Sequence, residues 1–113
     1  MKVGYDAKRA FQNFTGLGNY SRDLIKNIIE NFEDNEYWLY APKILNHPVT
    51  KTLEELSNVY FISPQSSIDK TFKSLWRSVN LEKELKKDGI EIFHGLSNEI
   101  PVRKKSSNVK YVV

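Results

Sequence analysis

Short apolar runs along this chain alternate with longer amphipathic segments. Five runs have the length and residue types of buried strands: Lys2 to Asp6, Tyr37 to Tyr40, Val59 to Ile62, Ile90 to Phe93 and Val109 to Val113. Between them, apolar residues recur at helical spacing in two stripes: Leu24, Ile25, Ile28, Ile29 and Phe32 in a helix from Tyr20, then Ile68, Phe72, Leu75, Trp76 and Val79. The pattern therefore predicts strands that alternate with helices.

Polar residues mark the expected helix ends. Asn19 or Ser21 is a suitable N-cap for the first helix, and Asp23 lies in its first turn. After the second stripe the helical phase slips, and Asn80 can cap a further helix. That helix should end at Lys86-Lys87-Asp88-Gly89, because lysines followed by glycine are typical of a helix C-terminus.

Residues 43–57 are expected to form a connection with one regular piece. Thr52 and Glu55 have the spacing of a capping box, which predicts a short helix from Leu53 to Ser57. His47 has no neighbour in the sequence that suggests a ligand role, so we expect it at the loop surface.

This alternation predicts an α/β fold, a doubly wound Rossmann-like parallel sheet of about five strands in a single domain, residues 1–113. The sequence given stops inside an apolar strand, and parallel sheets need both faces covered. We therefore expect either the N-terminal part of a longer protein or another partner on this face. Self-association into a homo-oligomer through the uncovered sheet face is one such outcome.

Composition limits the classes of binding partner and the location that we expect for this chain. A net charge of +3, from 17 basic and 14 acidic residues, is too weak to indicate nucleic acid but suits anionic ligands or an anionic lipid surface. The chain has no cysteine and no apolar run near the ~18 residues of a membrane span. We expect a cytoplasmic protein, with peripheral attachment at the inner membrane face as an open alternative.

The stretch Gly16, Leu17, Gly18 and Asn19 stands where the predicted first helix begins. Glycines there let a ligand approach the backbone, and a helix N-terminus favours an anionic group, so we expect a phosphate. The alternative is that both glycines only turn the chain and cap the helix. Ser21 stands at the third glycine position of a dinucleotide fingerprint, and no lysine and hydroxyl complete a P-loop, so neither NAD binding nor ATP hydrolysis is expected.

Polar residues follow two of the predicted strands. Lys8 and Arg9 come after the first strand, and His94, Ser97, Asn98 and Glu99 come after the fourth. These side chains could face the glycines across a crevice, where they would suit a ligand rich in hydroxyl groups. A lone histidine at a strand end is more often structural than catalytic. With two histidines 47 positions apart and no clustered acids, no metal or cofactor is expected.

The opening GYDAKRAFQNFTGLGNYSRDLI, the pair Trp76-Arg77 and the phrase FHGLSNEIP resemble the N-terminal domain of bacterial retaining glycosyltransferases of family four, which have the GT-B fold. The resemblance implies transfer of a sugar from a nucleotide-sugar donor to a glycan or lipid-linked acceptor in surface polysaccharide synthesis, of the hexosyltransferase type. By this match Gly16 and Gly18 would approach the donor diphosphate, within a predicted phosphate-binding stretch that also includes Leu17 and Asn19. On this interpretation the acceptor-side or site-shaping residues are Lys8, Arg9, Tyr20, His94, Ser97, Asn98 and Glu99.

The same resemblance implies that the nucleotide-sugar site lies in a second lobe that this chain lacks, and that the family's histidine–aspartate pair would follow the strand Val109 to Val113. The chain alone should therefore be inactive. The other interpretation is a non-catalytic α/β binding module, or a subunit that completes a site with a separate chain. A basic segment with one aromatic residue predicts either attachment to anionic lipid or plain solvated surface. Its members are Lys70, Lys73, Trp76, Arg77, Lys83, Lys86 and Lys87.

Overall fold

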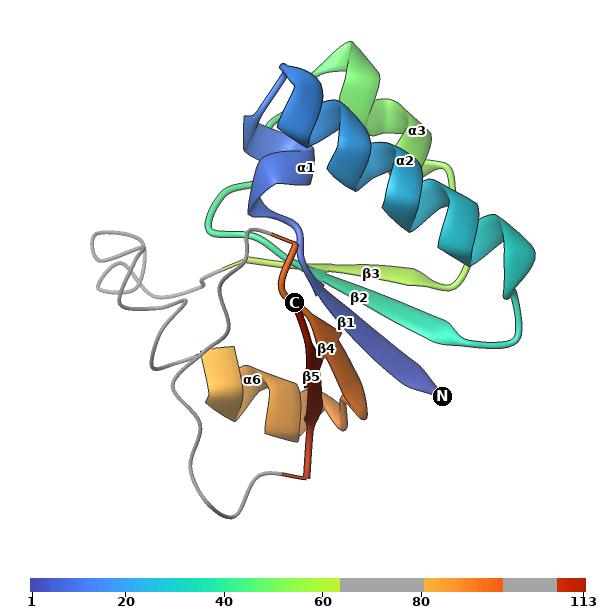
Figure 1. Cartoon of the computed structure of the whole chain (residues 1–113), viewed down its shortest axis with the longest axis vertical. Coiled ribbons are helices and arrows are strands. Elements are labelled where there is room, and N and C mark those ends of the chain that lie inside the picture. The colour runs from blue at the N-terminus through green and yellow to red at the C-terminus, as the bar shows by residue number, and fades with distance from the viewer. Residues whose placement is uncertain (64–80, 97–107) are drawn as a thin grey trace.

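The strands form one five-stranded sheet in which every neighbouring pair is parallel (Figure 1). In this computed structural model, residues 1–63, 81–96 and 108–113 are described. The strands are β1 (Lys2–Asp6), β2 (Glu36–Tyr40), β3 (Val59–Ile62), β4 (Ile92–His94) and β5 (Lys110–Val112). The predicted α/β, Rossmann-like class with a parallel sheet is therefore confirmed.

In the strand order β3-β2-β1-β4-β5, the chain adds strands on one side of β1 and then, from β4, on the other side. The point where the order reverses lies between β1 and β4. The chain first runs outward from β1 to β3 and then returns to build β4 and β5 on the other side of β1. Tyr5 of β1 lies opposite His94 of β4 in the register. The carboxyl ends of β1 and β4 are thus neighbours at the point where ligands bind in open α/β sheets.

Helices of the described residues lie on both faces of the sheet (Figure 1). One face carries α1 (Lys8–Gln12), α2 (Gly16–Asn31) and α3 (Lys51–Glu54), with a 3₁₀ turn, η1 (Pro48–Thr50), before α3. The other face carries α6 (Leu81–Asp88). The apolar cluster beneath α1 to α3 takes strand side chains from β1, β2 and β3, and none from β4 or β5 among the described residues. Val112 of β5 is accordingly 46% exposed.

The end of α6 confirms the predicted stop signal. Gly89 has φ +74°, the left-handed conformation that glycine adopts without strain. Its N–H donates to the Lys86 carbonyl, and the Ile90 N–H donates to the Leu85 carbonyl, which is the Schellman arrangement. Because Ile90 closes the helix, β4 begins at Ile92 and not at Ile90 as expected.

Two other predicted helix boundaries were wrong, and a third lies outside the described residues. The first long helix begins at Gly16, about one turn earlier than Tyr20. The short helix spans Lys51–Glu54 and not Leu53 to Ser57, because His47 and Thr50 form the capping interaction that we assigned to Thr52 and Glu55. The stripe from Ile68 to Val79 and the cap Asn80 fall outside the described ranges. Among the helices that are described, none has the length and apolar character to cross a membrane.

Candidate functional site

The chain leaving β1 forms a short helix that our sequence analysis did not predict. Asp6 is buried, and its Oδ1 accepts a hydrogen bond of 3.2 Å from the Lys8 N–H. The buried side of α1 is formed by its N-cap Ala7 and by Ala10 and Phe11, which are all fully buried. Their i, i+3, i+4 spacing is the signal that could have indicated this helix. This helix carries Lys8, which is exposed, and Arg9, which is half-buried, to the carboxyl edge of the sheet.

Asn13 fixes where α2 begins. Its Oδ1 accepts hydrogen bonds from the Thr15 N–H (2.9 Å), the Thr15 Oγ1 hydroxyl (2.7 Å) and the Gly18 N–H (3.1 Å). Satisfying the third amide of the helix from outside lets the helix start at Gly16, and this is why the predicted caps Asn19 and Ser21 lie inside it. Within the described part of the chain, the N–H groups of Gly16 and Leu17 donate no hydrogen bond.

The two glycines have different surroundings. A Cβ on Gly18 would lie 1.8 Å from the Asn13 carbonyl oxygen and 2.6 Å from its carbon. Gly18 is therefore required by close backbone packing, which supplies a structural reason that needs no ligand. A Cβ on Gly16 would meet nothing within 4 Å, so its backbone faces open space.

Arg22 holds the α1–α2 corner together. The side chain is buried, and its guanidinium donates to the carbonyls of Ala10 (2.9 Å) and Asn13 (2.7 Å) and to the Asn19 side chain. Both this arginine and the Asn19 amide oxygen are thus engaged within the protein. Sequence reasoning missed Asn13 and Arg22; the available signal was a charged residue one turn after Gly18, on the side of the helix that Ile25 and Ile29 bury.

His94 ends β4 on the other side of the strand reversal. Its ring lies 5.7 Å from the Tyr5 ring, measured between centroids, and is half-buried. Burial lowers the pKa of His94, so its imidazole is neutral near pH 7 and can both donate and accept a hydrogen bond. Burial also raises the pKa of the Tyr5 phenol.

The structure brings part of the predicted site to one edge. The β1–β4 pairing sets His94 beside the strand that leads into α1 and α2, which carry Lys8, Arg9 and Gly16 to Asn19. Tyr20 is 60% exposed on α2. Ser97, Asn98 and Glu99 lie outside the described residues. Among the residues that are described, no group of three or more histidines, cysteines or acids is placed to hold a metal ion.

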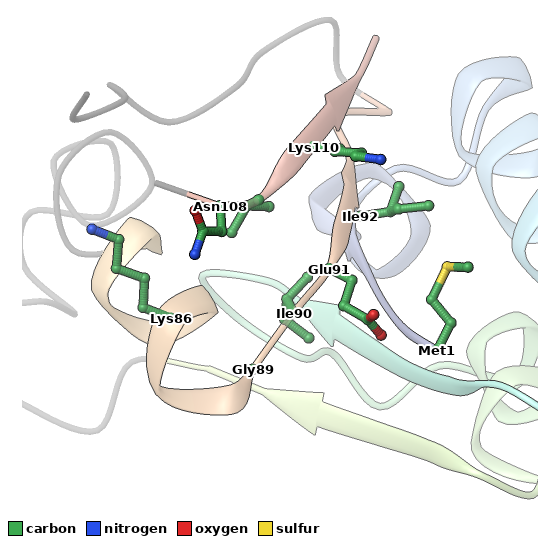
Figure 2. Close-up of a pocket in the computed structure, with 9 residues that line it drawn as sticks. Met1, Lys86, Gly89, Ile90, Glu91, Ile92, Asn108 and Lys110 are labelled. Atoms are coloured by element: carbon green, nitrogen blue, oxygen red, sulfur yellow. The ribbon is translucent and has the colours of Figure 1, made fainter. Parts of the chain in front are cut away.

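A pocket of about 610 Å³ lies at the opposite edge, at the amino ends of β1, β4 and β5 (Figure 2). Two lysines, one glutamate and several apolar side chains surround it: Met1, Lys86, Gly89, Ile90, Glu91, Ile92, Asn108, Val109 and Lys110. Of these, only Lys86 was considered from the sequence as a functional residue, as part of the basic segment. The pocket lies away from the carboxyl ends of the strands, so it is separate from the predicted site.

Comparison of the chain with protein-family models, with curated proteins and with solved structures found no match. The candidate site is the edge where β1 and β4 end. That edge offers two amides at the start of α2 that donate no hydrogen bond to a described residue, a neutral histidine, and exposed basic and aromatic side chains.

Proposed function

We propose that this chain is the acceptor-side lobe of a metal-independent, retaining glycosyltransferase that takes its sugar from a nucleotide-sugar donor. The acceptor is a glycan or a lipid-linked glycan. The observation that carries the proposal is the pair of unbonded amides, Gly16 and Leu17, at the start of a 16-residue helix beside the strand reversal. The family resemblance in the opening stretch supplies the reaction class.

The amides of Gly16 and Leu17 suit the diphosphate of the donor. Backbone N–H groups at a helix N-terminus point outward, and the helix dipole favours negative charge there. Open space around the Gly16 Cα lets phosphate oxygens reach the backbone. Gly18 and Asn19 support this geometry indirectly, since one bonds to Asn13 and the other to Arg22.

The acceptor side of the proposal uses groups that bind sugar hydroxyls. A neutral His94 imidazole has one donor and one acceptor nitrogen, which matches a hydroxyl that both gives and takes a hydrogen bond. Tyr20 offers an exposed aromatic ring on the helix that starts with the amides. Lys8 and Arg9 on α1, and Ser97, Asn98 and Glu99 beyond β4, complete the acceptor-side set by their place in the sequence. Recognition of the donor's nucleoside and sugar, and catalysis, would then need a second lobe, whereas the contact with the diphosphate belongs to this chain.

Calorimetry with a panel of nucleotide sugars, among them UDP-glucose and GDP-mannose, tests the proposal. Gly16→Val places a branched side chain in the open space before the amides. It should lower the affinity for the nucleotide sugar that the parent chain binds by tenfold or more, about 1.4 kcal/mol. Asn27→Val, at an exposed position later in the same helix, is the matched control and should bind as the parent chain does.

Unchanged affinity in Gly16→Val would return these glycines to a purely structural role. The absence of binding by any nucleotide sugar would favour the alternative, a non-catalytic α/β module.

A further inference from the structure

Four large apolar side chains at the start of α2 and in η1 are exposed to solvent. Phe14, Leu17, Tyr20 and Val49 are each between 40% and 60% exposed. They come from the turn between α1 and α2, from the first turns of α2, and from η1, which directly precedes α3 (Figure 1). Phe14 stacks on the His47 ring, with 4.1 Å between ring centroids, and the Val49 N–H donates to His47 Nδ1 at 3.2 Å. We call these four side chains the apolar corner.

Leu17 and Tyr20 lie three positions apart on α2, so they are neighbours on its surface. Helical side chains lean toward the N-terminus of their helix, which brings both toward Phe14, just before the first turn. The pair projects from the side of α2, whereas the free N–H groups at a helix start point along its axis. A partner on the apolar corner and a ligand at these amides therefore use different atoms.

The charged residues of the segments that build the apolar corner are all basic. Residues 7–22 and 41–53 contain five basic residues and no acidic one: Lys8, Arg9, Arg22, Lys43 and Lys51. The Arg22 guanidinium carbon lies 5.8 Å from the Phe14 ring centroid, and the Lys43 carbonyl accepts a hydrogen bond from Gln12 at the end of α1. Residues 23–36, in contrast, contain five acidic residues and one lysine. Positive charge and exposed apolar side chains thus share one end of α2.

We propose that the apolar corner seats this chain on the surface of an anionic membrane. Its four side chains enter the interfacial region, and the basic residues around them contact lipid phosphates. Together these side chains expose on the order of 400 Å². Each partner in a stable protein interface contributes about 800 Å², whereas a membrane needs less apolar area because its charge adds to the attraction. The contact uses no sugar donor, so it is independent of the proposed transferase reaction.

Sedimentation of the chain with vesicles tests the proposal. Binding to phosphatidylcholine mixed with phosphatidylserine should exceed binding to phosphatidylcholine alone, and it should weaken as salt is added. Tyr20→Ser should lower the partition coefficient about tenfold. Phe32→Ser is the matched control and should bind as the parent chain does, because Phe32 is also 60% exposed but lies at the acidic end of the same helix.

Charge reversal separates the apolar corner from the basic segment on α6. Lys51→Glu should weaken binding about fivefold, whereas Lys87→Glu should leave it unchanged. All four substituted positions are exposed, so the fold should be retained. A larger loss in Lys87→Glu than in Lys51→Glu would place the membrane on α6 and overturn the proposal. Equal losses in Tyr20→Ser and Phe32→Ser, equal binding to both kinds of vesicle, or no binding would also overturn it.

Discussion

The contrast between Gly18 and Gly16 gives a sharp test of how the α1–α2 corner is built. In Gly18→Ala, the new Cβ would lie 1.8 Å from a backbone oxygen, closer than any real contact, so the Asn13 peptide must move. That movement pulls the Asn13 carbonyl away from Arg22, which donates to it at 2.7 Å, and draws Asn13 Oδ1 from the Gly18 N–H.

The expected cost follows from the bonds that are lost. A hydrogen bond to a charged group contributes about 1.5 to 3 kcal/mol, and a neutral one about 0.5 to 1.5 kcal/mol. Against this stands a gain of up to about 1 kcal/mol, because alanine favours a helix more than glycine does. We therefore expect Gly18→Ala to lower the free energy of unfolding by about 1 to 3.5 kcal/mol. Gly16→Ala, in open space, should leave it unchanged or raise it slightly.

Urea denaturation followed by circular dichroism measures both variants against the parent chain, with the slope against urea as the check that the unfolded state is unaltered. If Gly18→Ala proves as stable as Gly16→Ala, the Asn13–Gly18 contact does not determine the residue at this position. The glycine would then need another explanation, such as a ligand that touches its backbone.

Three further predictions address the sheet and its edges. Burial holds the pKa of His94 below the pKa of the same histidine in the unfolded chain, so the unfolded state takes up the proton first as pH falls. The free energy of unfolding should therefore decrease from about pH 7.5 to 5.5. This dependence on pH should be shallower in His94→Gln. An equal slope in both proteins would contradict that reasoning. Tyr40→Phe removes a hydrogen bond of 2.7 Å from the phenol to the Asp88 carboxylate and should cost about 1.5 kcal/mol in urea denaturation, whereas an unchanged midpoint would show that water replaces the bond. Val112 lies on the part of the sheet that no described helix covers, so it should support self-association of the chain. Light scattering should then detect a dimer or larger species, and Val112→Asp should reduce it to a monomer. A parent chain that stays monomeric at high concentration would refute this.

The fold class and most strands could be predicted because apolar periodicity reports which side chains are buried. Gly89 at the end of α6 could be predicted too, since lysines and glycine act locally. The start of α2 could not, because the group that satisfies its third amide is Asn13, which lies before the helix and bonds across a turn. The ring contact of His47 could not be predicted for a similar reason: its stacking partner Phe14 is 33 positions away in the sequence, and only the folded chain brings the two rings together.

The candidate site divides along the same line. His94 and the glycine stretch could be placed on one edge from the sequence, because the carboxyl ends of parallel strands share an edge of the sheet. The parallel pairing of β1 with β4 agrees with that placement. Which of the four residues Gly16 to Asn19 has a free backbone donor depends on Asn13, because its Oδ1 accepts from the Gly18 N–H across the turn, a bond that no spacing rule indicates. The Asn19 N–H donates to the Thr15 carbonyl, as helix geometry requires.

Mapping backbone amide shifts while a nucleotide diphosphate sugar is added tests the central claim most directly. The proposal predicts that the largest shifts fall on Gly16 and Leu17, with smaller ones near His94, and that the pocket at the amino ends of β4 and β5 is unaffected. Shifts confined to Glu91, Asn108 and Lys110, with Gly16 and Leu17 unchanged, would place the ligand at the opposite edge and contradict the account.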